Sequence, residues 1–379
     1  MTDFRARAVI STDALLSNLD RVRGVAGVDA MAVVKADAYG HGVDYIAPLL
    51  RKHGITWLGV ALPSEALALR ASGDEGNILA WLSTPGDPDI ARCIAANVDL
   101  SVSSMRELTE IIAAAESLAT VARVHIKIDT GLSRNGVQLE SLEEILHLAR
   151  IAVATNKIHV RGVWSHLASA DHADVEISRQ SVAEQIAVFE AALEAFTAMG
   201  ITPEIRHLAN TAGALWHPST RYDLVRIGIG MYGLSPNAER ATASDLGLVP
   251  AMQVQARISS IKVIPPGTGV SYGHTWRADA PTTIGLVPIG YADGLPRNLG
   301  NTVEFALSGV RVPQIGTIAM DQCVVNLDPV QNAQPGDLVN IFGTGSSGEM
   351  TADEMAGRMG SVGYEIVTRL GVRVPRVYQ

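Results

Sequence analysis

Short apolar runs rich in β-branched residues alternate with longer segments of helical apolar spacing between about residue 30 and residue 235. We interpret each short run as a strand and each longer segment as the helix that follows it. The eight predicted strands are 31–35, 57–62, 78–82, 99–102, 122–129, 159–166, 204–208 and 224–229. Parallel strands joined by helices are covered on both faces, so the pattern predicts a (β/α)8 barrel of the TIM type.

The predicted helices have recognisable edges. Ser64 and Glu65 open one helix, whereas Gly54 and Gly73 close two others. The segment 178–199 is a long amphipathic run, which predicts a helix with one buried face.

The pattern changes after Pro236. The predicted strands 254–263, 283–288, 303–312 and 337–342 are separated by turns rich in glycine and proline. One short helix is predicted at 351–359, with Thr351 as its N-cap and Glu354 as the capping partner three positions later. We therefore predict an α/β plus β fold: a barrel of residues 10–235 and a mainly β domain of residues 236–379, which residues 1–9 are expected to join.

Composition narrows the class of function. The 379 residues carry a formal net charge of −9, which provides no broad basic surface for nucleic acid or anionic lipid and favours a small-molecule partner. Cys93 and Cys323 are the only cysteines, so neither a disulfide framework nor a cysteine metal site is expected. The first residues lack a signal-peptide core and no apolar run reaches membrane-spanning length, so we expect a cytoplasmic protein.

Reactive side chains of such barrels gather where strands end. The string Met31-Ala-Val-Val-Lys35-Ala-Asp-Ala-Tyr39-Gly-His41-Gly42 places an amine at that position, followed by a phenol and a glycine-rich turn. A lysine so placed can form a Schiff base with a carbonyl compound. The alternative is that Lys35 only extends its ammonium group into water.

Three further strand ends carry polar residues. The string 207–213 contains Asn210 and Thr211, which suit either an anion site at a helix start or a simple N-cap. The string 225–233 supplies glycines for close backbone approach together with Arg226. His166 ends a third strand, where it can face a ligand or fill the core.

These strings together resemble the alanine racemase family along nearly the entire chain, through both predicted domains. The resemblance implies pyridoxal 5′-phosphate as the cofactor, with Lys35 as its covalent attachment and Tyr39 and Tyr364 beside its phosphate. The implied coenzyme contacts are Lys35, Tyr39, Arg134, His166, Asn210, Thr211, Arg226, Gly228, Ile229 and Tyr364. Arg226 would face the pyridine nitrogen, and because arginine only donates hydrogen bonds, that nitrogen stays unprotonated. His166 would link Arg226 to a catalytic tyrosine.

Racemisation needs a base on one face of the substrate and an acid on the other, so Lys35 requires an opposed partner. The family resemblance assigns this role to Tyr272, in the string 269–276 of the β domain, and implies that the partner subunit donates it. A phenol has a reference pKa near 10, so neighbouring cations or hydrogen bonds must favour its phenolate. A homodimer with composite active sites follows from the resemblance.

The remaining implied residues concern the substrate. Arg134 and, by the same logic of a composite site, the backbone of Met320 of the partner subunit would contact the alanine carboxylate. Asp321 would support the Met320 loop, and Tyr291 would line the substrate channel. Lys127 matches a lysine that is carbamylated in many relatives, which would let an anion orient Arg134.

Three departures from the family pattern leave the substrate range open. They are Thr317, Ala319 and Leu295, which stand where relatives often carry arginine, cysteine and a larger residue. A racemase that also accepts serine therefore stays open, as do a decarboxylase of similar architecture and a non-catalytic protein that carries pyridoxal phosphate. The family makes D-alanine for peptidoglycan precursors a reasonable role.

Overall fold

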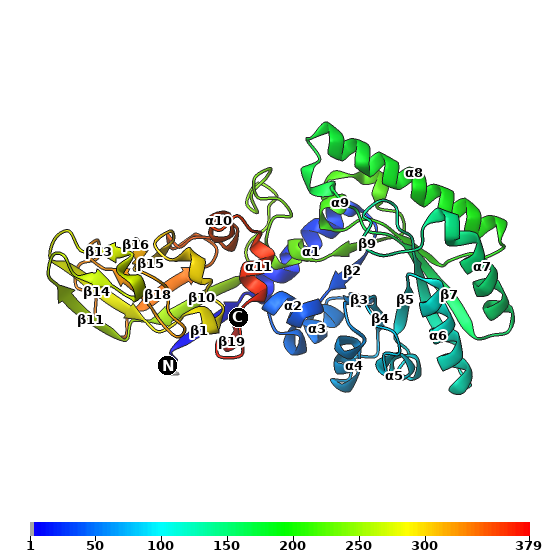
Figure 1. The fold of residues 1–379 in the computed structure, drawn as a ribbon, viewed down its shortest axis with the longest axis horizontal. Helices are drawn as coiled ribbons and strands as arrows, with labels where there is room; N and C mark the ends of the chain where they lie inside the picture. Colours follow the sequence, from blue (N-terminus) through cyan, green and yellow to red (C-terminus); the bar gives the residue numbers. More distant parts are fainter. Residues whose placement is uncertain (1–3) are drawn as a thin grey trace. The chain divides into compact units, whose positions relative to one another are not determined.

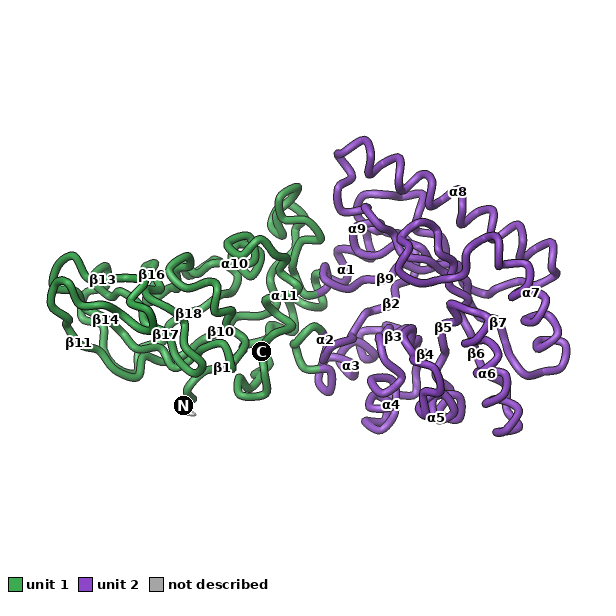
Figure 2. Tube along the Cα trace, viewed as in Figure 1, with its two compact units in different colours: residues 1–18, 39–42, 232–379 green, residues 19–38, 43–231 purple. Residues whose placement is uncertain are grey.

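The computed structural model describes residues 4–379, which divide into two compact units (Figure 2). One unit comprises residues 19–38 and 43–231, and we call it the barrel unit. The other comprises the described residues up to 18, residues 39–42 and residues 232–379, and we call it the β unit. Each is described by itself below.

The barrel unit contains eight parallel strands that form a nearly closed barrel, in the order β8-β7-β6-β5-β4-β3-β2-β9 (Figure 1). They are β2 (Asp29–Val33), β3 (Trp57–Val60), β4 (Asn77–Ala80), β5 (Asp99–Val102), β6 (Ala122–Lys127), β7 (Ile158–Trp164), β8 (Ile205–His207) and β9 (Leu224–Ile227). All eight were predicted, and the predicted fold class is confirmed. Most end one or two residues earlier than predicted, because their final residues already belong to the loops that follow the strands.

Helices follow the strands and cover the outside of the barrel (Figure 1). They are α3 (Val43–Lys52), α4 (Pro63–Ala71), α5 (Asp89–Ala95), α6 (Met105–Ser117), α7 (Leu139–Ala154), α8 (Glu176–Ala198) and α9 (Thr211–Trp216). Helix α1 (Thr12–Ala26) precedes β2, and its residues up to 18 belong to the β unit. Gly54 and Gly73 follow α3 and α4 with φ of +87° and +90°, as expected of glycines that end helices.

The segment after β2 differs from the prediction. The strand predicted through Lys35 stops at Val33, and Lys35 begins α2 (Lys35–Gly40), whose next four residues have φ between +51° and +56°. This is a left-handed helical turn, which costs roughly 1–2 kcal/mol per non-glycine residue. Nothing in the residue types announces it, since Ala, Asp and Tyr rarely adopt this conformation in succession.

The β unit is built on a nine-stranded sheet in the order β11-β14-β17-β16-β15-β18-β10-β1-β19, beside the hairpin β12-β13. The strands are β1 (Ala6–Ile10), β10 (Met252–Arg257), β11 (Ser260–Ile264), β12 (Gly269–Val270), β13 (Trp276–Arg277), β14 (Thr282–Val287), β15 (Glu304–Leu307), β16 (Val310–Ile315), β17 (Cys323–Asn326), β18 (Leu338–Phe342) and β19 (Arg376–Tyr378). Its helices are α10 (Ala352–Gly357) and α11 (Gly363–Thr368).

Two predicted strands of this unit are wrong as single elements. The run 254–263 contains β10 and β11, and the run 303–312 contains the hairpin β15-β16. Ser308 and Gly309 turn that hairpin with φ of +52° and +81°, a geometry that apolar periodicity does not reveal. The predicted capping box of α10 is confirmed, since Glu354 donates its N–H to Thr351 Oγ1 at 3.1 Å and its carboxylate accepts the Thr351 N–H at 2.7 Å.

Two properties of residues 4–379 concern membranes and metal ions. None of the helices combines the length and apolar character needed to cross a membrane. Within the same residues, the His, Cys, Asp and Glu side chains form no cluster of three that could hold a metal ion.

Candidate active site

Lys35 leaves the end of β2 at the start of the left-handed turn. Its backbone is held from a neighbouring βα unit, because the Glu65 carboxylate accepts the N–H of Ala36 at 2.6 Å. The same carboxylate accepts the N–H groups of Ala61 and Leu62 at 2.8 and 3.0 Å, ahead of α4. One side chain therefore fixes both the residue after Lys35 and the adjacent loop. The predicted opening of α4 by Glu65 is correct, but its second role was not foreseen.

Replacing Glu65 with glutamine is expected to loosen the turn after Lys35. A glutamine amide has one acceptor oxygen, so at least one of the three N–H groups loses its partner. The lost hydrogen bond to a charged group is worth about 1.5–3 kcal/mol, so we expect the Ala36 amide to exchange with solvent about tenfold faster or more. Hydrogen exchange by mass spectrometry over the peptide containing residues 35–38 measures this.

The same substitution removes a negative charge that raises the pKa of Lys35. The Lys35 amine should therefore react with an amine reagent at lower pH than in the wild type. Glu354→Gln is the matched control, because Glu354 also caps a helix through its carboxylate but lies in the β unit. An equal change at Lys35 in both variants would contradict the assigned role of Glu65.

Cations gather at the end of the barrel unit where its strands finish. Burial, followed by the charge of Arg134, lowers the pKa of Lys35, although Glu65 opposes this shift. The pKa of Lys127 falls to about 8, again through burial and then through Arg134 and Arg226. Lys127 also donates a hydrogen bond to Asn135 Oδ1. Such mutual repulsion is tolerated where an anion is to be bound.

Arg226 on β9 is buried and held mostly by carbonyl groups. Its Nη1 donates to His207 O at 3.0 Å, and its Nη2 donates to Ser165 O at 2.7 Å and Leu208 O at 2.9 Å. The Nη2 also lies 3.3 Å from His166 Nδ1. Burial lowers the pKa of Arg226 to about 9, which leaves the guanidinium charged at neutral pH.

Tryptophans support these cations. Trp164 at the end of β7 lies under Arg226 and Lys127, with distances of 4.9 and 4.8 Å to its ring centroid. Trp81 lies 5.9 Å from Lys35 Nζ and 6.0 Å from the Trp164 ring. The aromatic rings stabilise positive charge on one side of the site. Their role was not predicted from the sequence, although Trp164 lies in the predicted strand 159–166.

The segments that follow β8 and β9 are buried and hydrogen-bonded to each other. Asn210 caps α9 by accepting the Gly213 N–H at 2.9 Å, as the N-cap interpretation predicts. Thr211 Oγ1 accepts the Gly228 N–H at 3.1 Å, so the ends of β8 and β9 are tied together. A Cβ at Gly230 would lie 2.7 Å from Thr211 Cγ2, which explains why this turn needs glycine.

The β unit brings together a second group of predicted residues. Tyr272 lies in the turn 272–274 with its side chain 71% exposed, and its carbonyl accepts a hydrogen bond from Thr317 Oγ1 at 2.8 Å. The loop of Met320 is tied to that of Tyr291, because the Ala292 N–H donates to Met320 O at 2.9 Å. Asp321 pairs with Arg373 at 2.8 Å.

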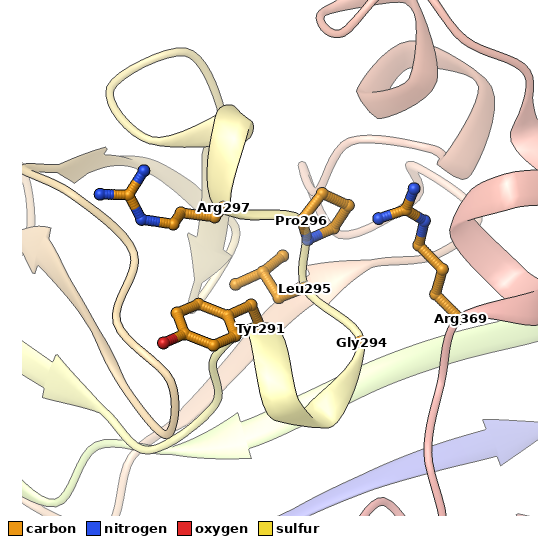
Figure 3. Close-up of a pocket in the computed structure, with 6 residues that line it drawn as sticks. All are labelled: Tyr291, Gly294, Leu295, Pro296, Arg297 and Arg369. Carbon is orange, nitrogen blue, oxygen red and sulfur yellow. The ribbon is translucent and has the colours of Figure 1, made fainter.

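An open pocket of about 330 Å³ adjoins Tyr291, with Leu295, Arg297 and Arg369 around it (Figure 3). Tyr39 and Tyr364 lie elsewhere in the same unit, where their ring centroids are 6.1 Å apart. Burial raises the pKa of Tyr39, so its hydroxyl keeps its proton and can donate a hydrogen bond.

Comparison with known proteins identifies the family. Residues 10–236 match the family description "Alanine racemase, N-terminal domain", and residues 251–378 match "Alanine racemase, C-terminal domain". An alanine racemase of Beutenbergia cavernae is 46% identical over 376 residues, which cover 99% of this chain and 98% of that protein. The chain belongs to the alanine racemase family. It is therefore an isomerase.

Solved alanine racemases share the fold of both units. The crystal structure of the enzyme from D-cycloserine-producing Streptomyces lavendulae matches with a TM-score of 0.96 and 43% identity, over 100% of this chain and 98% of that one. The alanine racemase of Bartonella henselae, described with covalently bound pyridoxal phosphate, matches with a TM-score of 0.87 and 26% identity over 100% of both chains.

Two histidines beside Arg226, His166 and His207, stay neutral in the folded protein. Burial, followed by the charge of Arg226, lowers the pKa of His166 and of His207 well below 6.5. In the unfolded chain both take up a proton below about pH 6.5. The unfolded state then binds more protons, so the free energy of unfolding falls as the pH drops through that value.

Urea unfolding of the coenzyme-free protein at pH 7.5, 6.0 and 5.0 checks this prediction. Each histidine should contribute a loss of about 1.4 kcal/mol per pH unit below pH 6. The variant His166→Asn keeps an acceptor near Arg226 but does not titrate, so its stability should fall with a correspondingly smaller slope. Equal slopes for the two proteins would show that His166 is charged in the folded state.

Proposed function

We propose that this chain is a pyridoxal-phosphate-dependent alanine racemase that interconverts L-alanine and D-alanine by a two-base mechanism. Lys35 serves one face of the substrate and Tyr272 of the partner subunit serves the other. The observation that carries the proposal is the group of cationic side chains around Lys35, at the end of the barrel where the strands finish. The chain also belongs to the alanine racemase family. The Bartonella relative, which carries the coenzyme covalently, supports the choice of cofactor.

The residues present fit this coenzyme. The pKa of the Lys35 amine is lowered, which favours its neutral form. The neutral amine is the form that bonds a carbonyl carbon. The phosphate would be met by N–H groups at the starts of α9 and of the turn 229–232, because the first N–H groups of a helix have no partner within it. Thr211, Gly228 and Ile229 would form that cradle, in which the Gly228 N–H already donates to Thr211 Oγ1. The Asn210 cap holds it, and Tyr39 and Tyr364 are the proposed phenol donors.

When bound, pyridoxal phosphate supplies a carbonyl carbon that bonds an amine and a ring that draws electrons from the Cα–H bond. Arg226 would face the ring nitrogen as a donor and keep it unprotonated. By limiting electron withdrawal in this way, Arg226 favours prompt return of the proton to Cα. Lys35 holds or delivers the proton on its own face of the substrate.

His166 would connect Arg226 to the second base. Because Arg226 only donates, His166 Nδ1 must accept, so the neutral imidazole carries its proton on Nε2. That N–H can donate to the phenol oxygen of Tyr272 of the partner subunit. We therefore propose a homodimer in which each active site is composite. The exposure of Tyr272 in the β unit is consistent with such a role.

Substrate binding is assigned to the same two groups of residues. Arg134 and the N–H of Met320 of the partner subunit would bind the alanine carboxylate, and Asp321 positions the Met320 loop through its ion pair with Arg373. Tyr291 would narrow the channel, since its loop is hydrogen-bonded to that of Met320. D-Alanine made in the cytoplasm for peptidoglycan precursors is the role that we propose.

Lys127 is proposed to carry a carbamate. With a pKa of about 8, part of its amine is neutral at neutral pH and can add carbon dioxide, releasing one proton and leaving an anion near Arg134. We expect a carbamate signal in the carbon-13 NMR spectrum of protein kept in labelled bicarbonate. The signal should weaken below pH 7 as the amine is protonated. A signal that persists in Lys127→Ala would contradict the assignment.

Racemisation in deuterated water tests the proposed function. L-Alanine should lose its optical rotation while deuterium enters at Cα, and D-alanine should behave likewise. A protein that only carries the coenzyme gives neither result, and a decarboxylase releases carbon dioxide. Serine enantiomers in the same assay define the substrate range that Thr317, Ala319 and Leu295 leave open.

A further inference from the structure

The barrel interior holds a continuous polar chain. TIM barrels are usually filled by layers of branched apolar side chains. Here Asp99 on β5, His125 on β6 and His207 on β8 are all fully buried, and Arg226 on β9 is nearly so. Buried polar groups of this kind are costly unless every member is hydrogen-bonded.

The chain is connected from one end to the other. Arg226 Nη1 lies 3.2 Å from the nearer ring nitrogen of His207. The other ring nitrogen of His207 lies 2.9 Å from a ring nitrogen of His125. The second ring nitrogen of His125 lies 3.2 Å from Asp99 Oδ2.

The hydrogen bonds of this polar chain can run in one direction only, from Arg226 to Asp99, because arginine only donates and a carboxylate only accepts. Arg226 can only donate, so the His207 nitrogen facing it must be bare. Because the pKa of His207 is lowered by burial, its single proton lies on the nitrogen that faces His125. The facing nitrogen of His125 must then accept. The remaining His125 nitrogen carries a proton and donates it to the Asp99 carboxylate, which can only accept.

We propose that Asp99 is a positioning residue for Arg226, acting through the fixed tautomers of His125 and His207. This inference rests on the proposed function, in which Arg226 faces the coenzyme ring. Without the carboxylate, His125 is free to carry its proton on the nitrogen facing His207. His125 then donates to His207, so the direction of the hydrogen bonds is reversed and the proton of His207 lies on the nitrogen that faces the N–H groups of Arg226. Two buried donors would face each other, and Arg226 would have to move.

Asp99 also has a structural role, which the test must distinguish from its proposed role in positioning Arg226. It forms ion pairs with Arg123 at 2.9 Å and Arg161 at 3.2 Å. Asp74 is a matched control, because it is a buried carboxylate in the same barrel unit that pairs with Arg51 at 2.7 Å and Arg70 at 3.1 Å. Among residues 4–379, the Asp74 carboxylate has hydrogen bonds and ion pairs with Arg51, Arg70 and Gly76, none of which belongs to the histidine chain.

Nitrogen-15 NMR of the imidazoles in the coenzyme-free wild-type protein is the first test, and it requires neither a variant nor activity. We expect one bare and one protonated nitrogen on each of His125 and His207, with the bare nitrogen of His207 facing Arg226. A charged imidazole, or a proton on the nitrogen facing Arg226, would overturn the inference. This result is independent of whether the protein racemises alanine.

Variants provide the second test. In Asp99→Leu we expect mixed tautomers at His125 and His207, and a kcat for alanine at least about tenfold lower with KM nearly unchanged, because Arg226 is not assigned to the substrate carboxylate. Asp99→Asn keeps an oxygen acceptor and should restore both the wild-type tautomers and most of kcat. Asp74→Leu should leave the tautomers unchanged. If Asp99→Leu keeps wild-type tautomers, or Asp74→Leu disturbs them equally, Asp99 has only a structural role.

Discussion

Replacing Lys35 with alanine is expected to abolish racemisation in both directions and covalent retention of the coenzyme. Lys35 is assigned two tasks, bonding the coenzyme carbonyl and moving a proton at Cα. Positioned acid–base catalysis alone is worth about 10²–10⁴-fold, so kcat should fall by at least about 10⁴-fold when both tasks are lost. The physical basis is the lowered pKa of Lys35, which favours the neutral, nucleophilic amine.

The measurements are an optical assay with alanine and borohydride trapping followed by peptide mapping. In the wild type the trapped coenzyme should lie on the peptide containing Lys35. Lys52→Ala removes an exposed lysine of α3 and should leave both results unchanged. A coenzyme trapped on another lysine in Lys35→Ala would overturn the site assignment.

Replacing Tyr272 with phenylalanine is expected to stop inversion but not coenzyme binding. The substitution removes only the hydroxyl, so the aromatic ring still occupies its place in the turn 272–274. Lys35 is unchanged and should still exchange the α-proton of one enantiomer. The second face has lost its acid and base, so racemisation should slow by about 10²–10⁴-fold.

Deuterium incorporation separates the two faces. In deuterated water we expect one alanine enantiomer to exchange its α-proton without inversion, and the other to exchange very slowly. Tyr45→Phe, which removes a hydroxyl outside the proposed site, should racemise as the wild type does. Equal loss of exchange for both enantiomers in Tyr272→Phe would contradict a separate base on each face.

The barrel could be predicted because its strands are short, mainly apolar runs and its helices keep a regular apolar spacing. The site residues at strand ends could be predicted for the same reason, since parallel strands finish at the same end of the barrel. Lys35 and Arg226 were singled out in this way, whereas Lys127 came from the family resemblance, and the lowered pKa values of all three residues reflect their burial.

Other features depend on register and cannot be read from residue types. The left-handed turn after Lys35 is maintained by Glu65, which lies 29 positions away from Ala36. Asp99 and His125 meet only because β5 and β6 pair in one particular register. The hairpin turn at Ser308 divides one apolar run into two strands, which periodicity alone does not show.

The most direct test of the account mixes two inactive proteins. Lys35→Ala still has Tyr272, and Tyr272→Phe still has Lys35, so a mixed dimer regains one complete site if Tyr272 is donated by the partner subunit. Random exchange of subunits makes half of the dimers mixed, and we predict a return of racemase activity to about a quarter of the wild-type value. If the mixture stays as inactive as its parents after verified subunit exchange, the two opposed bases do not come from different subunits and the proposed mechanism is wrong.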